Sequence, residues 1–171
     1  MSRYRPPRPQ SAPYITAAGA AALKSELDKL WRIERPKVTD AVREAAKNGD
    51  RSENGDYIYG KKRLREIDSR VRYLTKRLES LKVISAPPAE PDKIFFGASV
   101  TLEDEEGSFQ TLHIVGADEI DPKTGKISID APIARALLGK RIDDEIQYQA
   151  PAGPQVRYVT AINYQLLKGN N

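Results

Sequence analysis

The feature that most constrains this fold is a heptad pattern of apolar residues between about Glu53 and Lys82. The steps alternate between three and four residues, and Gly60 fills the one heptad place without an apolar side chain. The apolar positions are Tyr57, Leu64, Ile67, Val71, Leu74, Leu78 and Leu81. A pattern of this length predicts a long helix that packs against a second helix along a coiled-coil seam.

The preceding stretch supplies the second helix. Thr16 is a suitable N-cap, a run rich in Ala, Leu, Glu, Lys and Arg follows it, and Gly49 suits a helix stop. Pro36 lies inside this run and removes a backbone hydrogen bond, so we expect one helix with a bend there. We place Trp31 on the apolar side of this helix, in the core.

The loop between the two helices is short, so they must run antiparallel as a hairpin, which we assign to residues 15–84. Thirty helical residues extend about 45 Å at about 1.5 Å each. The hairpin is therefore a rod, and residues 48–56 lie at its tip.

Both flanks of the predicted hairpin differ from it in composition. Residues 1–14 are basic and rich in proline, which predicts a flexible arm. Residues 85–92 contain "SAPPAEP" and predict a linker. Beyond them, a short helix starts at Pro132 and strand-like segments occupy residues 93–103, 108–116, 125–131, 144–150 and 156–164. Residues 93–171 thus predict a small antiparallel sheet with a short helix, and the whole chain an α+β fold.

Composition excludes several classes of site. The chain has no cysteine and a single histidine, His113, which argues against disulfides, thiolate nucleophiles and zinc sites. We expect His113 to be structural, because it lies in a predicted strand. No apolar run approaches the length of a membrane span, and we expect a cytoplasmic protein.

The net charge of +4 conceals an asymmetry. Residues 1–82 carry 20 basic and 11 acidic side chains, whereas residues 83–171 carry 8 and 13. In the heptad register, Lys62, Arg65, Arg72 and Lys76 all face away from the seam. This outer stripe could be an ordinary solvated surface, or it could face a polyanion such as nucleic acid.

The tip holds three acids at three-residue intervals, Asp50, Glu53 and Asp56. They could be helix caps, because Asp50 (or Ser52) suits an N-cap and Glu53 then has capping-box spacing, with Asp56 in the first turn. They could instead bind Mg²⁺, which takes one or two carboxylates and keeps its other positions for water or substrate oxygens. A rod has no pocket of its own, so such a site would be completed by another protein.

The stretch "GDRSENGDYIYGKKRLREIDSRVRYLTKRLE" resembles the bacterial Gre transcript-cleavage factors, and specifically their GreB branch. The signature of that family is a Gly-Asp-x-x-Glu-Asn tip followed by an acidic-Tyr pair, matched here by Gly49, Asp50, Glu53, Asn54, Asp56 and Tyr57. The segments "FFGASV" and "SIDAPIARALLGK" are also similar to GreB, and the likeness spans roughly residues 14–165.

This resemblance implies an N-terminal coiled coil and a C-terminal FKBP-like domain. It implies that the coiled coil enters the secondary channel of RNA polymerase and stimulates cleavage of backtracked RNA, without being an enzyme itself. Asp50 and Glu53 would help to hold a Mg²⁺ shared with the polymerase and position the attacking water. Contacts with the extruded RNA 3′ end or the channel would come from Arg51, Ser52, Asn54, Lys61, Lys62, Arg65, Arg72 and Lys76. We expect a monomer.

Two glycines depart from the family pattern: Gly55 and Gly60 stand where Ala and Asn are expected. Two rival functions also remain open. The chain could be a secondary-channel ligand that inhibits or modulates without cleavage, although Asp50 and Glu53 are intact. The FKBP-like fold could instead indicate a prolyl isomerase or chaperone, although its half of the chain has few aromatic residues to line such a pocket.

Overall fold

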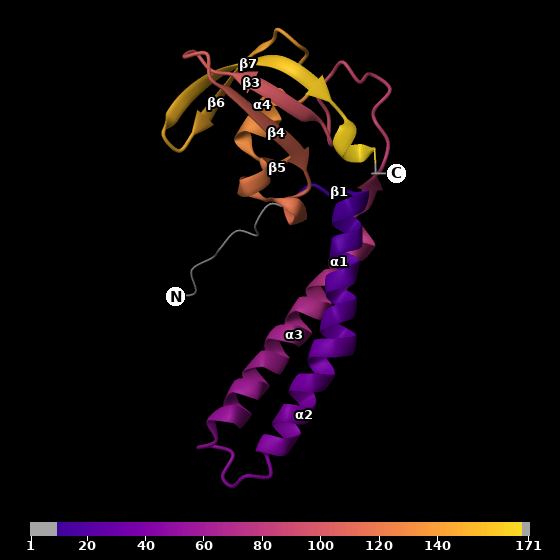
Figure 1. Ribbon diagram of the computed structural model, residues 1–171, viewed down its shortest axis with the longest axis vertical. Coiled ribbons are helices and arrows are strands. Elements are labelled where there is room, and N and C mark those ends of the chain that lie inside the picture. Colours follow the sequence, from indigo (N-terminus) through magenta and orange to yellow (C-terminus); the bar gives the residue numbers. More distant parts are fainter. Residues whose placement is uncertain (1–9, 169–171) are drawn as a thin grey trace, which may run out of the picture. The chain divides into compact units, whose positions relative to one another are not determined.

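A computed structural model describes residues 10–168 of the 171-residue chain (Figure 1). The chain divides into two compact units. Of the described residues, 20–81 form a helical unit, and 10–19 with 82–168 form a globular unit.

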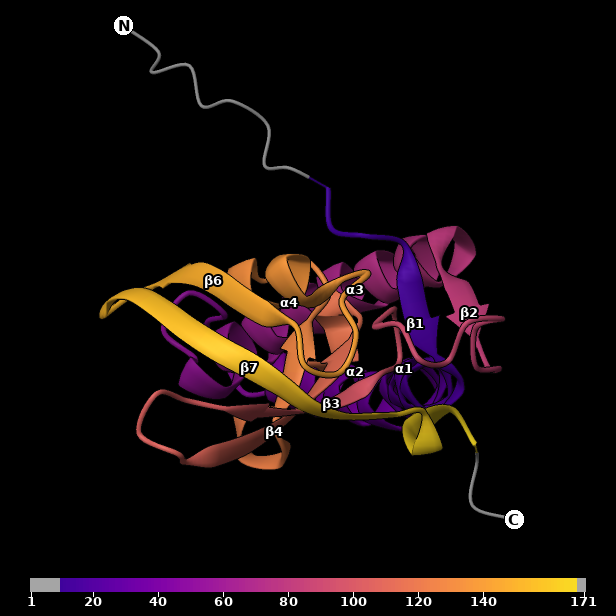
Figure 2. The same ribbon diagram turned by 90° about the horizontal axis from the view of Figure 1, so that it is seen from above.

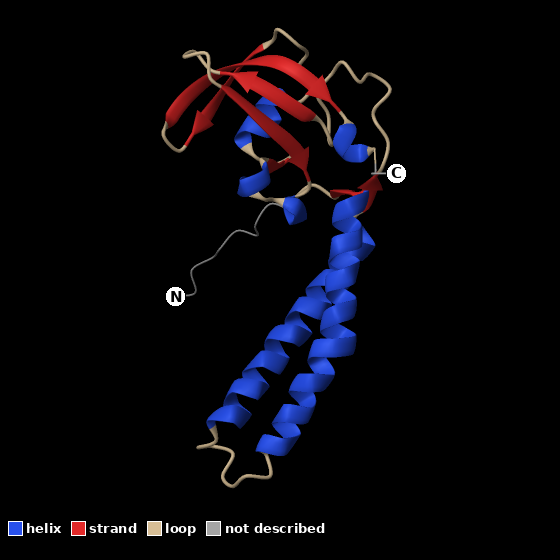
Figure 3. Cartoon of the chain, viewed as in Figure 1, coloured by secondary structure: helices blue, strands red, loops and turns tan. Residues whose placement is uncertain are grey.

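The helical unit consists of two long antiparallel arms, drawn as blue ribbons in Figure 3. One arm comprises α1 (Ala17–Lys29), a π-helical segment η1 (Leu30–Glu34) and α2 (Arg35–Ala45), and the other is α3 (Gly55–Ser80). The predicted helical hairpin is therefore confirmed.

The seam of α3 follows the predicted heptads. Gly60, Ile67 and Leu74 are buried, and the four apolar residues between and beside them are half-buried: Tyr57, Leu64, Val71 and Leu78. The opposite arm contributes buried Ala20, Leu23, Leu30 and Ala45.

The bend expected at Pro36 takes the form of a π turn just before it. The Arg35 N–H donates to the Leu30 carbonyl, five residues back, and Pro36 then lies in the first turn of α2. A first helical turn tolerates proline because its N–H groups have no partner within the helix. Because the π turn ends at Glu34, a new α-helix begins at Arg35 and Pro36 falls in its first turn, where proline is tolerated.

Both helices end short of their predicted limits at the tip. The helix before the tip ends at Ala45, so Gly49, with φ +92°, lies in the loop and not directly after the helix. The second helix starts at Gly55, two residues later than expected.

The globular unit contains a curled five-stranded sheet whose order is β5-β4-β3-β7-β6 (Figure 1). Its elements are β3 (Ser99–Glu103), β4 (Phe109–Val115), β5 (Lys126–Ser128), α4 (Pro132–Leu137), β6 (Glu145–Ala150) and β7 (Gly153–Asn163). The strand-like segments and the short helix are confirmed.

The expectation of a purely antiparallel sheet was wrong, because β5 pairs with β4 in parallel. Between these strands the chain passes through two short 3₁₀ turns, Ala117–Glu119 and Pro122–Thr124. They carry the chain back so that β5 enters beside β4 in the same direction, which a tight hairpin could not do. The sheet is mixed.

One core fills the globular unit. Val100 and Leu102 of β3, Ile114 of β4 and Val159 of β7 pack with Ala134 and Leu137 of α4, all at most 1% exposed. Alternate strand residues thus point to the side that α4 covers.

A second, two-stranded sheet was not expected. The strands β1 (Tyr14–Thr16) and β2 (Lys82–Ile84) pair in parallel and lie side by side in Figure 2. Tyr14 was assigned to the flexible arm and the other residues of both strands to the ends of the coiled coil, because three residues are too few to show a strand periodicity.

Thr16 also caps α1 as predicted, since its Oγ1 accepts the Gly19 N–H (3.1 Å). Of the predicted basic arm, residues 1–9 lie outside the described residues. Ala12, near its end, donates its N–H to Asp130 Oδ2 at 2.9 Å.

Candidate functional site

The candidate site is the tip loop, residues 46–53, which joins the end of α2 to the start of α3 (Figure 1). Neither Asp50 nor Ser52 caps α3. The cap is Asn54, whose Oδ1 accepts the Tyr57 N–H at 3.1 Å. The capping box proposed for Asp50 and Glu53 is therefore wrong, because the helix begins one residue after Asn54.

Asp50 folds its own loop. Its Oδ1 accepts the Ser52 N–H (2.9 Å), and its carbonyl accepts the Glu53 N–H (3.3 Å). This is the turn that aspartate side chains form with the backbone two residues on. The hydrogen bonds from Ser52 hold the pKa of Asp50 below its usual value, so the carboxylate stays ionised.

The side chain of Glu53 has no role in the fold of the tip. Its carboxylate is exposed and makes no hydrogen bond or ion pair within residues 10–168. Asp56, by contrast, lies in the first turn of α3, where the helix dipole favours a negative charge. Asp56 thus has a structural explanation, whereas Glu53 has none.

The two tip carboxylates suit a hard cation, because exposed carboxylate oxygens are ligands that Mg²⁺ accepts. In the part of the chain that the structure describes, no three acidic, histidine or cysteine side chains gather into a metal site. The tip therefore offers two oxygen ligands, and the remaining ligands would have to come from elsewhere.

Arg51 folds back over the start of α3. Its guanidinium lies 5.8 Å from the centroid of the Tyr57 ring, within the range of a cation–π contact. Both it and Ser52 remain exposed at the tip.

The outer stripe of α3 is exposed along its whole length. The stripe consists of Lys62, Arg65, Arg72 and Lys76, and Lys61 lies next to it. None of these five cations forms an ion pair within residues 10–168. The cations beside the seam differ: Arg35 pairs with Asp68 (2.8 Å), Arg63 with Glu34 (2.8 Å) and Arg70 with Glu26 (2.7 Å). Three acids of this unit thus pair with cations beside the seam, whereas no acid forms an ion pair with a stripe residue within residues 10–168.

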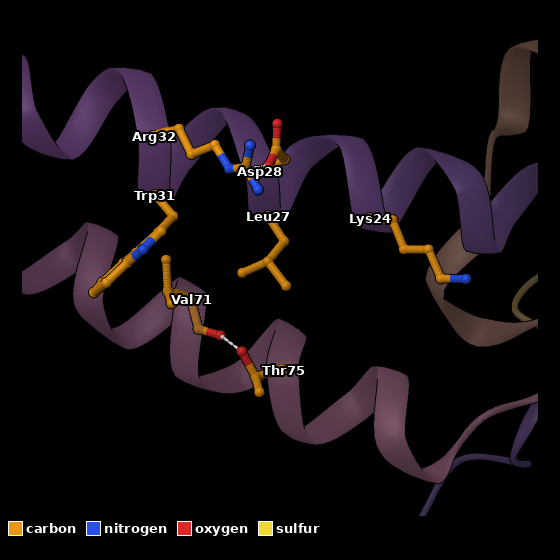
Figure 4. A pocket seen from close by; sticks show the side chains of 7 residues that line it. All are labelled: Lys24, Leu27, Asp28, Trp31, Arg32, Val71 and Thr75. Carbon is orange, nitrogen blue, oxygen red and sulfur yellow. Dashed lines mark hydrogen bonds and ion pairs between the residues drawn. The ribbon is translucent and has the colours of Figure 1, made fainter.

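Trp31 is not in the core, contrary to expectation, since it is 54% exposed. Leu30, seven residues after the buried Leu23, occupies the seam at 7% exposure, and Trp31 lies beside it. Its ring lines a hollow of 420 Å³ together with Lys24, Leu27, Asp28, Arg32, Val71 and Thr75, whose side chains are drawn in Figure 4. The Arg35 guanidinium lies 5.2 Å from the ring centroid.

Comparison with known proteins finds two family models that match successive parts of the chain. A family model described as "Transcription elongation factor, N-terminal" matches residues 13–83, and one described as "Transcription elongation factor, GreA/GreB, C-term" matches residues 88–164. The chain belongs to the GreA/GreB family of transcription elongation factors. The family assignment made from the tip signature is confirmed.

Curated relatives place this Gre factor in the GreB branch. It is 58% identical to transcription elongation factor GreB of Pseudomonas aeruginosa, over 96% of this chain and 98% of that protein. GreB of Xanthomonas axonopodis pv. citri is 52% identical over 98% of this chain and 100% of the relative. Among solved structures, a GreA/GreB factor from Nitrosomonas europaea covers 90% of this chain and 100% of its own, with 21% identity and a TM-score of 0.41.

This Gre factor is accordingly a transcription elongation factor of the GreB type, which stimulates transcript cleavage by RNA polymerase. The cleaving enzyme is the polymerase and not the factor. Of the helices within residues 10–168, none has the length and apolar character needed to cross a membrane.

Proposed function

We propose that this Gre factor inserts its helical unit into the secondary channel of RNA polymerase and brings Asp50 and Glu53 to the backtracked RNA 3′ end. There the two carboxylates share a Mg²⁺ with the polymerase. The observation that supports this proposal is that both carboxylates are exposed on the tip loop and neither caps α3.

The chemistry divides between the two partners. When bound, the shared Mg²⁺ activates water and stabilises the leaving oxygen of the RNA phosphate. Asp50 contributes a carboxylate that Ser52 keeps ionised, and Glu53 contributes one that is free to turn toward a ligand. Two ligands bind Mg²⁺ weakly on their own, so the factor carries no tightly bound metal.

The unpaired cations support an RNA-facing role for the outer stripe. We assign contacts with the extruded RNA or the channel wall to the exposed side chains of Arg51, Ser52, Lys61, Lys62, Arg65, Arg72 and Lys76. Asn54 is left out of this set, because its amide oxygen and nitrogen both bind within the chain. The factor acts as a cytoplasmic monomer.

The test compares Asp50→Asn and Glu53→Gln with Asp56→Asn in a backtracked polymerase complex. Both tip variants keep their side-chain shape but lose the ionised ligand, so we expect the rate of RNA cleavage to fall about a hundredfold while polymerase binding persists. Asp56→Asn is the control, because it removes the same charge from the same tip and should cleave nearly as well as wild type.

Normal cleavage by both tip variants would show that Asp50 and Glu53 are not ligands. A wild-type protein that binds the polymerase but does not increase cleavage would instead support the non-cleaving channel ligand.

A further inference from the structure

The side chain of Asn54 connects the two helices that flank the tip. Its Oδ1 accepts the Tyr57 N–H of α3 (3.1 Å), and its Nδ2 donates to the Ala45 carbonyl at the end of α2 (2.7 Å). Asn54 is half-buried between these partners.

This bridge satisfies two helix ends at once. The N–H groups at the start of α3 have no partners within their own helix, and the Ala45 carbonyl at the end of α2 accepts only the Asn48 N–H (3.1 Å) besides Asn54 Nδ2. One amide supplies both an acceptor and a donor, whereas a carboxylate supplies only acceptors and a serine hydroxyl is too short to reach across. Asparagine is therefore the cap residue that can also hold the second helix.

The bridge closes the tip loop at its base. Ala45 and Asn54 directly flank residues 46–53, which contain Asp50 and Glu53. No residue of the loop is buried, and inside it Asp50 holds only the Ser52 and Glu53 N–H groups. With no packed side chains to fix it, the loop depends on hydrogen bonds for its shape, and Glu53 is the residue next to Asn54.

We propose that Asn54 is a positioning residue. Its amide bridge from Ala45 to Tyr57 sets the geometry in which Asp50 and Glu53 meet the shared Mg²⁺. This inference rests on the proposed function of the two carboxylates, but the bridge itself can be tested without polymerase.

The experiment compares Asn54→Asp with Asn48→Asp in the full chain. Asn54→Asp keeps an acceptor for the Tyr57 N–H, so α3 remains capped, but it loses the donor to Ala45. Asn48 lies in the same loop, is exposed and forms no side-chain hydrogen bond within residues 10–168, so its variant is matched in chemistry and charge.

Two readouts separate positioning from folding. We expect amide hydrogen exchange of residues 46–57 to accelerate about tenfold in Asn54→Asp and to stay unchanged in Asn48→Asp, with the middle of α3 protected in both. In the polymerase complex, we expect the maximal cleavage rate of Asn54→Asp to fall about tenfold and its half-saturating Mg²⁺ concentration to rise. Its affinity for polymerase should stay within about twofold of wild type.

Equal rates of amide hydrogen exchange for residues 46–57 in Asn54→Asp and Asn48→Asp would show that the Asn54 bridge does not hold the loop. Faster exchange with the cleavage rate and Mg²⁺ dependence of Asn48→Asp would overturn the positioning role and leave a purely structural one. If Asp50→Asn and Glu53→Gln cleave normally, the proposed function fails and the positioning role fails with it. The exchange comparison still decides whether the bridge exists.

Discussion

At the scale of single residues, the two glycines that depart from the family pattern have different explanations. A Cβ on Gly60 would lie 2.5 Å from Val42 Cγ2, so this glycine allows α2 and α3 to approach closely. A Cβ on Gly55 would meet nothing within 4 Å, and its φ is not in the left-handed region. Gly60 is thus explained by packing, and nothing in the structure explains Gly55.

Replacing glycine by alanine should therefore change the free energy of unfolding in opposite directions at Gly55 and Gly60. We expect Gly55→Ala to raise the free energy of unfolding by about 0.5 to 1 kcal/mol, because alanine loses less backbone entropy in a helix. Gly60→Ala should lower it by about 1 to 3 kcal/mol, because Val42 must move. Urea unfolding followed by helical circular dichroism measures both. A stabilised Gly60→Ala would mean that the helices adjust freely at this point.

At the scale of elements, the distribution of ion pairs distinguishes the two sides of α3. Arg35, Arg63 and Arg70 each pair with an acid on the other arm or on α3, at the edges of the seam. These pairs favour the observed antiparallel register, although such exposed pairs contribute little stability. The stripe residues form no such ion pairs within residues 10–168, although Arg72 is close enough to Asp68 to contribute to its lowered pKa.

Neutralising the stripe should slow the cleavage of long extruded RNA more than that of short extruded RNA. We expect the change of Lys62, Arg65, Arg72 and Lys76 to Gln to slow cleavage of deeply backtracked complexes several-fold more than that of shallow ones, because only a long extruded strand reaches along α3. Cleavage rates of defined backtracked complexes, measured at two salt concentrations, provide the test.

The matched control removes the same number of charges from outside the stripe. Lys29, Arg32 and Arg43 of the other arm and Lys47 of the tip loop each lie within 4.0 Å of an acid, so changing these four residues to Gln leaves the stripe itself intact. Equal slowing of deep and shallow complexes by the stripe variant would argue against RNA guidance and favour a general contact with the channel.

At the scale of the whole molecule, several groups make stability depend on pH in one direction. Hydrogen bonds from Arg70, Arg35 and Lys93 lower the pKa of Glu26, Asp68 and Glu90 respectively. Burial, followed by the charge of Lys126, lowers the pKa of His113. A lowered pKa means that the unfolded chain binds more protons, so stability decreases as the pH falls.

The first loss of stability on acidification should come from His113. Its Nδ1 lies 2.6 Å from Ser99 Oγ, and the lowered pKa favours the neutral ring. We expect the urea midpoint to fall below about pH 6.5, the usual histidine pKa, before the carboxylates contribute below about pH 4.5. His113→Asn, which keeps a polar atom near Nδ1, should remove the first loss. An unchanged pH profile in that variant would assign the loss to other groups.

The sequence by itself determined the features that repeat locally. The heptads of α3 fixed its seam and its outward cations, because a helix of known period places each residue on one face. The strand-like segments and α4 were equally readable. The tip signature identified the family, and the three-residue spacing of its acids showed that Asp50 and Glu53 could act together.

Only the tertiary structure decided the features that join distant segments. The parallel pairing of β1 with β2 and of β4 with β5 depends on partners that no local period reveals. Leu30, and not its neighbour Trp31, is buried against the second helix, because only one of two adjacent helical residues can face the seam. The cap of α3 is Asn54 and not Asp50, and the same amide also donates to the carbonyl of Ala45, nine residues away. Such choices follow from the free energy of contacts in three dimensions, which a linear pattern does not contain.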